Sequence, residues 1–311
     1  MRTVFLGTPA FAVPTLERML AAGHSIELVV TQPDRPKGRG NSIAMSPVKE
    51  AALRHGLEVF QPERIRRPEG VDKLRAIAPE IMVIVGYGQI IPQSILDIAP
   101  RGILNVHASL LPKYRGAAPI QWAIANGESV TGVTIMQIDA GLDTGDMLRK
   151  AEMPIGENET AIELSPRLAE VGADLLVATL ADLDSLTPEK QDNNLATMAP
   201  ILKKEDGAID WRRPAREIHN RIRGLQPWPG AFTSFRGAAL HVWSSRFIGR
   251  TTSAAPGTLD FEQRRLYAAC GDGLFLELRE VQAEGRKRLP ADVFANGARL
   301  AAGELLGETK S

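Results

Sequence analysis

The chain opens with Arg2-Thr-Val-Phe-Leu-Gly7-Thr-Pro9, an apolar run that ends at a glycine and is followed by a helical pattern from about residue 10 to residue 22. A buried strand, a tight turn and a helix in this order are typical of a parallel α/β sheet. Similar apolar runs follow at residues 25–31, 81–85 and 103–107, with helical patterns between them. We therefore predict a doubly wound, mostly parallel, Rossmann-like sheet for the N-terminal part.

The turns of this predicted sheet lack the glycines of a dinucleotide site. The first turn runs Gly7-Thr-Pro-Ala-Phe11, without the Gly-x-Gly-x-x-Gly spacing that lets backbone N–H groups approach a pyrophosphate. Gly86-Tyr-Gly88 follows a later strand and has no third glycine. We therefore expect no NAD-type cofactor.

The length of 311 residues indicates two domains. Residues 158–184 carry a long amphipathic pattern, and the polar stretch that follows interrupts it. From residue 232 to residue 281 the pattern changes to short β-like runs broken by glycine, which is typical of a small barrel. We predict an N-terminal domain over residues 1–184, a linker over 185–204 and a C-terminal domain over 205–311.

The run at residues 103–107 ends by presenting an amide and an imidazole together. Alternation along a strand places Asn105 and His107 on the same face. An amide N–H and an imidazole could bind a developing oxyanion and move a proton, which is the chemistry of acyl transfer. The alternative is a half-buried structural histidine beside a turn-forming asparagine, and an isolated Asn-x-His pattern favours that interpretation.

Asp143 is the candidate partner of His107. It lies in Asp139-Ala-Gly141-Leu-Asp143-Thr144-Gly145-Asp146, an acidic, glycine-broken loop after an alternating strand. A carboxylate beside an imidazole fixes its tautomer and favours its protonated form. By itself the loop could also be a polar turn; Ca²⁺ binding is disfavoured because the loop lacks the EF-hand length and the terminal glutamate.

Taken together, Asn105, His107 and Asp143 resemble the site of the folate-dependent formyltransferase family, whose members carry these residue types at the matching positions. The resemblance implies that a formyl group passes from 10-formyltetrahydrofolate, the co-substrate, to an amine. It also implies folate contacts from two loops, at Ser109, Leu110, Leu111, Pro112, Tyr87, Gly88, Gln89, Ile90 and Ile91. Gly86 departs from the family, which usually has alanine there, and this leaves a small packing difference open.

The second half resembles the C-terminal, OB-type barrel of the branch of this family that acts on an aminoacyl-tRNA. The matching pieces include Lys204-Glu-Asp-Gly207 and Ile222-Arg-Gly-Leu225. For this branch the resemblance implies that initiator methionyl-tRNA is the acceptor and that the amine attacks the formyl carbon directly. It also implies tRNA contacts from a basic loop and a basic cluster, at Arg35, Lys37, Arg39, Arg286, Lys287 and Arg288.

Charge alone does not predict an RNA partner. The chain has 37 basic and 37 acidic residues, and a basic loop is more often simply solvated. Asn41 and Ser42 stand where relatives often carry lysines, so we expect a shallower salt dependence than a lysine-rich loop gives. Met198 stands where this branch commonly has tyrosine, with no consequence that the sequence reveals.

The composition excludes several other classes of protein. Cys270 is the one cysteine, so a disulfide framework cannot form, and the five histidines lack metal-ligand spacing. No apolar run is long enough to cross a bilayer, and the chain starts almost directly in a strand. We expect a metal-free, cytoplasmic, bacterial-type monomer. The alternatives left open are formylation of a small amine, hydrolysis of formyltetrahydrofolate, and an inactive RNA-binding protein that kept the fold.

Overall fold

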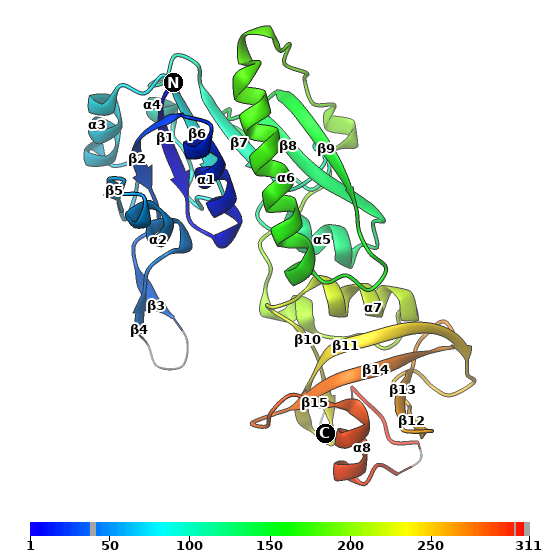
Figure 1. Cartoon of the computed structure of the whole chain (residues 1–311). Helices are drawn as coiled ribbons and strands as arrows, with labels where there is room; N and C mark the ends of the chain where they lie inside the picture. Colours follow the sequence, from blue (N-terminus) through cyan, green and yellow to red (C-terminus); the bar gives the residue numbers. More distant parts are fainter. Residues whose placement is uncertain (38–41, 302, 308–311) are drawn as a thin grey trace. The chain divides into compact units, whose positions relative to one another are not determined.

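The computed structural model describes residues 1–37, 42–301 and 303–307, which form two compact units (Figure 1). The first unit contains residues 1–116, 131–153 and 165–198, and the second contains residues 117–130, 154–164 and those from 199 onward. The chain therefore passes between the units several times. The domain limits at residues 184 and 205 stay a prediction. None of the helices in the described ranges has the length and apolar character needed to span a membrane.

A mixed sheet forms the centre of the first unit, with the strand order β5-β2-β1-β6-β7-β8-β9. Strands β5, β2, β1, β6 and β7 run parallel, and β8 pairs antiparallel with β7. The strands are β1 (Arg2–Gly7), β2 (Ser25–Val30), β5 (Val59–Phe60), β6 (Ile81–Val85), β7 (Ile103–His107), β8 (Val130–Gln137) and β9 (Met147–Pro154). The predicted parallel α/β fold is confirmed, with β8 as its antiparallel addition.

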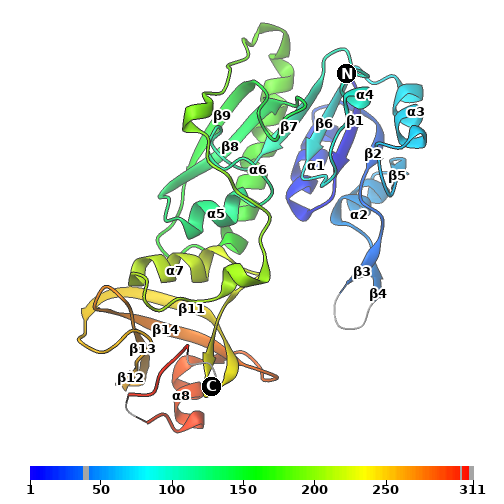
Figure 2. The same ribbon diagram turned by 180° about the vertical axis from the view of Figure 1, so that it is seen from behind.

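Helices cover both faces of this sheet. Figure 1 shows α1 (Val13–Ala21) and α6 (Ala161–Ala181) in front of it, and Figure 2 shows the opposite face with α3 (Pro68–Ile77) and α4 (Gln93–Leu96). Arg18 of α1 pairs with Glu170 and Asp174 of α6, at 3.0 and 3.3 Å. On the other face, α3 and α4 pack on the apolar side chains of β1, β2 and β6. A parallel strand needs such cover on both sides because it is buried on both.

The β2–β5 side of the first unit carries an extra hairpin and one more helix. Strands β3 (Arg35–Lys37) and β4 (Ser42–Ala44) pair antiparallel, and α2 (Pro47–Arg54) follows. The Ser46 side chain caps α2 by accepting a hydrogen bond from the Lys49 backbone N–H at 3.1 Å. The predicted basic loop is therefore carried on a hairpin, and Arg39 lies outside the described residues.

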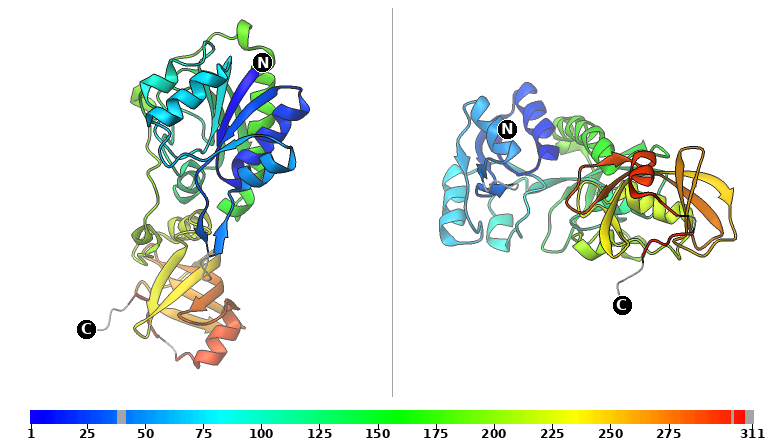
Figure 3. Two further views of the ribbon diagram at one scale, coloured as in Figure 1. Left: turned by 90° about the vertical axis from the view of Figure 1, so that its left-hand side faces the viewer. Right: turned by 90° about the horizontal axis from the view of Figure 1, so that it is seen from below.

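The second unit contains an antiparallel sheet with the order β10-β11-β14-β13-β12, and β15 pairs with β14. Its elements are α5 (Pro119–Ala125), α7 (Ala215–Gly224), β10 (Ala231–Phe235), β11 (Ala238–Thr251), β12 (Leu259–Glu262), β13 (Arg265–Ala269), β14 (Leu274–Ala283), β15 (Leu289–Pro290) and α8 (Ala291–Ala298). Figure 3 shows α8, in red, beside these strands, and α8 contacts β13 and β14.

The C-terminal segment joins the two edge strands of this sheet. Leu306 bridges Phe235 of β10, and Leu305 bridges Thr258 next to β12. The Leu306 N–H donates to the Gly257 carbonyl at 2.9 Å, and the Gly307 N–H donates to that of Ser234 at 2.9 Å. These contacts lie at one end of each edge strand, and joining the two edges there is consistent with the predicted small barrel.

Candidate active site

Strand β7 presents Asn105 and His107 at the carboxyl edge of the first unit's sheet. The two side chains point to the same face, and the residues are only 9% and 5% exposed. Asn105 lies opposite Ile84 of β6 and Met136 of β8, so strands on both sides fix its backbone. Its side-chain amide makes no hydrogen bond to any residue that the structure describes. A buried but unbonded amide is available to a ligand.

Both ring nitrogens of His107 face oxygen atoms. Nε2 is 3.0 Å from the carbonyl oxygen of Tyr114, and a carbonyl only accepts, so Nε2 carries the hydrogen. Nδ1 is 3.7 Å from Oδ2 of Asp143, which is an ion-pair distance and too long for a hydrogen bond. The neutral ring therefore keeps Nδ1 open, and a second proton there would face a carboxylate.

Asp143 is held in place by the backbone around it. Asp143 adopts a left-handed backbone conformation with φ of 50°. Its Oδ2 accepts a hydrogen bond from the Gly116 N–H at 2.8 Å. Gly145 must be a glycine because a Cβ there would lie 1.9 Å from the Gln137 carbonyl oxygen. The loop that carries Asp143 is thus shaped by close backbone contacts.

A polar bridge that the sequence did not reveal joins this loop to the one after β7. The buried Arg115 guanidinium donates to Oε1 of Gln191 at 3.0 and 2.8 Å and to Oδ1 of Asn193 at 2.9 Å. The Gln191 amide in turn donates to the carbonyls of Asp143 and Gly145, both at 2.8 Å. Gln191 lies in the stretch predicted as a linker, and no local pattern marks such a contact.

The predicted folate loop after β7 is tightly packed. Ser109 is fully buried and its hydroxyl donates to the Lys113 carbonyl at 2.6 Å, while Leu111 packs against Met136 and Met147. Leu110 and Pro112 are half-buried, and the Leu111–Pro112 peptide is cis. The side chains of Ser109 and Leu111 therefore shape the loop.

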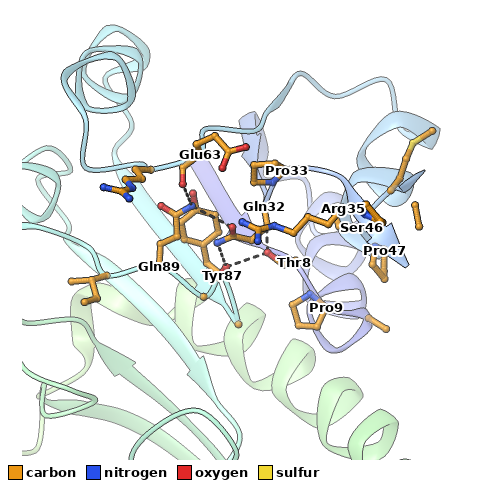
Figure 4. A pocket seen from close by; sticks show the side chains of 18 of the residues that line it. Thr8, Pro9, Gln32, Pro33, Arg35, Ser46, Pro47, Glu63, Tyr87 and Gln89 are labelled. Carbon is orange, nitrogen blue, oxygen red and sulfur yellow. Dashed lines mark hydrogen bonds between the residues drawn. The ribbon is translucent and has the colours of Figure 1, made fainter. Parts of the chain in front are cut away.

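A cavity of about 1150 Å³ lies at the carboxyl ends of β1, β2 and β6 (Figure 4). Parallel sheets bind ligands at this edge. Its lining residues come from the loops after β1, β2, β5 and β6, from the β3–β4 hairpin and from the start of α2: Thr8, Pro9, Ala10, Gln32, Pro33, Arg35, Pro36, Ala44, Met45, Ser46, Pro47, Glu63, Arg64, Arg66, Gly86, Tyr87, Gly88, Gln89 and Ile90. Asn105, His107 and Asp143 do not line it. Asn105 and His107 lie on β7, the neighbour of β6, and Asp143 reaches His107 from the loop between β8 and β9, so the cavity and the polar triad share one sheet edge.

The second predicted folate loop forms a wall of this cavity. The Tyr87 carbonyl accepts hydrogen bonds from Thr8 Oγ1 at 3.2 Å and Gln32 Nε2 at 3.0 Å, as Figure 4 shows. Gln89 Oε1 accepts from the Ile65 N–H at 2.8 Å. Gly88 and Ile90 are exposed, Ile91 is half-buried, and the Tyr87 side chain is only 1% exposed. Gly86 has φ of 58°, a left-handed conformation that favours glycine over the alanine expected from the family resemblance.

The cavity is lined by side chains of both charges, and a nearby carboxylate is held by hydrogen bonds. Arg35, Arg64 and Arg66 contribute cations and Glu63 an anion. Nearby, the Lys49 ammonium and the Gln61 amide bond to Asp34 and hold the pKa of its carboxyl below the usual range. Burial raises the pKa of the Tyr87 phenol, whose oxygen has no hydrogen-bond partner among the described residues. Tyr87 therefore stays neutral.

The residues predicted to contact tRNA fall into separate groups. Arg35 lies on β3 at the cavity, Lys37 ends that strand, and Arg39 is outside the described residues. Arg286, Lys287 and Arg288 are exposed between β14 and β15 of the second unit. There the Arg288 guanidinium pairs with Glu280 and lies 5.3 Å from the centroid of the Trp243 ring. No three histidine, cysteine, aspartate or glutamate side chains in the described ranges gather as a metal site.

Comparison with known proteins adds a family and named relatives. A model of the formyl transferase family matches residues 1–180, and one of the formyl transferase C-terminal domain matches residues 201–299. Proteins called methionyl-tRNA formyltransferase from Solibacter usitatus and Koribacter versatilis are 64% and 56% identical, over 99% and 100% of each chain. The solved N-formyltransferase of Helicobacter canadensis, with folinic acid and dTDP-3-aminofucose, covers 90% of this chain and 98% of its own. Its TM-score is 0.69 at 20% identity, which is a similarity of fold.

Proposed function

The chain belongs to the formyl transferase family, and from this premise we propose that it transfers the formyl group of 10-formyltetrahydrofolate to the free α-amino group of initiator methionyl-tRNA. The product is N-formylmethionyl-tRNA for translation initiation. The acceptor is inferred from the high identity to proteins called methionyl-tRNA formyltransferase, because this identity extends over the full chain and so covers both units. A fold shared with a sugar-modifying enzyme at 20% identity does not define an acceptor.

The reaction is a direct acyl transfer without a covalent enzyme intermediate. The neutral amine attacks the formyl carbon, and the carbonyl electrons move onto oxygen to give a tetrahedral oxyanion. Collapse of this intermediate breaks the bond to N10 of the folate, which takes up a proton as the amine loses one. An α-amine has an ordinary pKa near 8, so a useful fraction is neutral at physiological pH and no strong base is needed.

We assign three roles at the carboxyl edge of the sheet. The unbonded amide of Asn105 donates to the oxyanion. We assign His107 as the acid at this charge through Nδ1, because its Nε2–H is taken by the Tyr114 carbonyl. Asp143, whose Oδ2 faces Nδ1 at 3.7 Å, holds that charge and helps to relay the proton of the amine. The oxyanion gains from Asn105 and His107 directly, and from the Asp143 carboxylate only through His107, so these groups lower the barrier and do not simply hold the substrate.

The folate and the acceptor are assigned to neighbouring binding sites. We assign the folate to the loops at residues 109–112 and 87–91, which flank the triad along β6 and β7. We assign the methionine-bearing 3′ end to the cavity of about 1150 Å³, whose apolar prolines and Met45 suit a methionine side chain and whose arginines suit phosphates. Arg35, Lys37 and Arg39 would guide the acceptor end into it.

The same reasoning extends to location and assembly. Charged tRNA and reduced folates are cytoplasmic in bacteria, so we place the enzyme in the cytoplasm. All three proposed catalytic side chains come from a single chain, and we therefore propose that the enzyme works as a monomer.

A direct assay tests the acceptor. Purified protein is incubated with 10-formyltetrahydrofolate and either initiator methionyl-tRNA, elongator methionyl-tRNA or no acceptor, and formyl groups on methionine are measured. We expect strong preference for the initiator. Consumption of the donor with water or a small amine alone would keep formyl-transfer chemistry and reject the tRNA assignment. The Arg39→Gln substitution should lower the rate of formylation of tRNA and leave folate binding intact. An equal loss of both would contradict separate binding sites for tRNA and folate.

A further inference from the structure

Residues 189–198, within the stretch predicted as a linker, run along the candidate active site. One end of this segment is fixed by Glu189, which pairs with Met147 of β9 through two backbone hydrogen bonds of 2.8 Å. The other end is fixed by Met198, which bridges Arg115 in the loop after β7. We call residues 189–198 the clasp, and all of them belong to the first unit.

The clasp holds the carbonyl that faces Nε2 of His107. Thr197 Oγ1 accepts a hydrogen bond from the Tyr114 N–H at 2.9 Å, and the Thr197 carbonyl accepts one from the Arg115 N–H at 2.9 Å. The Tyr114 carbonyl, 3.0 Å from His107 Nε2, shares a planar peptide group with that Arg115 N–H. Tyr114 has φ of 62°, which is rare for a bulky residue and persists only where the surroundings hold it. Thr197 therefore fixes the direction of this carbonyl.

The clasp also holds the loop whose carboxylate faces Nδ1 of His107. The Gln191 amide donates to the carbonyls of Asp143 and Gly145, both at 2.8 Å. Its Oε1 accepts from the guanidinium of Arg115, a residue that is only 6% exposed. The two oxygen atoms that face the ring nitrogens of His107 therefore both depend on one short segment of the chain.

We propose that the clasp positions the formyl-transfer site, and that Thr197 keeps the hydrogen of the neutral His107 ring on Nε2. The two ring nitrogens face competing acceptors, because the Asp143 carboxylate would attract the hydrogen to Nδ1 and the Tyr114 carbonyl attracts it to Nε2. Since Tyr114 is held at 3.0 Å and Asp143 stands at 3.7 Å, the hydrogen stays on Nε2. Nδ1 then remains open to take up and give the reacting proton. The inference rests on the proposed function and adds Thr197 to it as a positioning residue.

Nitrogen-15 NMR of the histidine side chains reads this tautomer directly, and the His107→Gln spectrum identifies the His107 signals. Above about pH 8, where a histidine ring is ordinarily neutral, we expect the wild type to carry the hydrogen on Nε2. Thr197→Val removes the accepting oxygen at nearly constant side-chain shape, so the Nδ1–H form should gain population. Thr197→Ser keeps the oxygen and should keep the wild-type tautomer. An unchanged tautomer in a folded Thr197→Val protein would overturn the proposal.

Formylation kinetics give a second measurement of the same role. Thr197→Val should lower kcat roughly tenfold through misplacement of His107, with the KM for methionyl-tRNA unchanged and Thr197→Ser close to the wild type. Thr187→Val is the matched control, because Thr187 is exposed, precedes the clasp and makes no hydrogen bond to a described residue. An equal loss of kcat in the control, or a serine variant as slow as the valine variant, would contradict a role for the Thr197 hydroxyl.

A double variant, Thr197→Val with Gln191→Ala, tests whether the clasp acts as one element. Both changes act on the same imidazole ring, so their combined loss of kcat should be smaller than the product of the two single losses. A combined loss equal to that product would mean two independent effects and would reject a common element. A wild type that formylates no tRNA would instead reject the proposed function. The NMR tautomer of His107 would still decide the role of Thr197, so the two failures can be told apart.

Discussion

The edge of the first sheet and the basic cluster at residues 286–288 of the second unit use polar side chains in opposite ways. Asn105 and His107 are less than 10% exposed and stand on a strand that neighbours hold on both sides. Arg286 and Lys287 are exposed and long, and neither pairs with a described carboxylate. The first arrangement fixes donors within a fraction of an ångström, which an oxyanion requires. The second keeps mobile charges in solvent, which suffices for a ligand held by many weak contacts.

The sharpest test of this contrast is the removal of one buried donor. Asn105→Ala or His107→Ala should lower kcat by roughly a hundredfold to a thousandfold, the usual effect of losing an oxyanion donor. The KM for methionyl-tRNA should change little, because neither side chain is assigned to RNA. Single-turnover formylation measures the chemical step. Near-normal turnover in a folded variant would refute the assignment.

A smaller loss of kcat is expected when the hydrogen bonds that hold the Asp143 loop are removed. Gln191→Ala removes the bridge between Arg115 and the Asp143 loop and should lower kcat by roughly tenfold to a hundredfold through misplacement of Asp143. Gln191→Glu keeps the acceptor for Arg115 but loses the donor to the Asp143 carbonyl, so its kcat should fall in between. Asn194→Ala, an exposed neighbour, is the control. Equal kcat in the Gln191 and Asn194 variants would mean that the bridge is irrelevant to catalysis.

The salt concentration should change the affinity for tRNA by a moderate factor and leave the chemical step nearly unchanged. Raising the salt concentration from about 50 to about 200 mM should increase the KM for methionyl-tRNA by roughly tenfold for every two phosphate contacts made. The kcat at saturating tRNA should stay nearly constant, since charges buried at the triad are screened far less than exposed ones. A kcat that falls as steeply as the affinity would show that the distinction between the regions is wrong.

The smallest effect concerns Tyr87, whose buried hydroxyl has no hydrogen-bond partner among the described residues. Tyr87→Phe should raise the free energy of unfolding by about 1 kcal/mol, because an unsatisfied polar group is removed. Burial raises the pKa of this phenol above its ordinary value. The folded state therefore keeps the proton that the unfolded chain releases above about pH 10, and stability falls as the pH rises beyond that point.

The Phe variant should lose the part of this alkaline decline that comes from Tyr87 and keep the part that comes from the buried Cys270 thiol, whose pKa burial also raises. Denaturant titrations of both proteins at pH 8 and pH 10.5 would measure the difference. A lower stability of the variant at both pH values would instead mean that the hydroxyl has a partner. Unchanged folate binding by the variant would limit the predicted role of Tyr87 in that loop to its backbone.

The sequence by itself determined the local elements of this protein. Apolar runs predicted β1, β2, β6 and β7 nearly to their limits, and period-two alternation predicted that Asn105 and His107 share a face. These features depend on neighbours in the chain, and periodicity reports such neighbours directly. The acidic loop after the next alternating strand supplied Asp143 as the candidate partner, the resemblance to a family agreed with it, and the structure places its Oδ2 3.7 Å from His107 Nδ1.

Only the tertiary structure decided which distant segments meet. The bridge from Arg115 to Gln191 spans 76 positions, the edges of the second sheet are joined by residues near the C-terminus, and the Thr197 hydroxyl meets the backbone of Tyr114 from 83 positions away. Such contacts depend on strand order and register, which bring together side chains whose spacing along the chain has no period. Gln191 looked like part of a polar linker for this reason, because its hydrogen-bond partners lie in loops far away in the sequence.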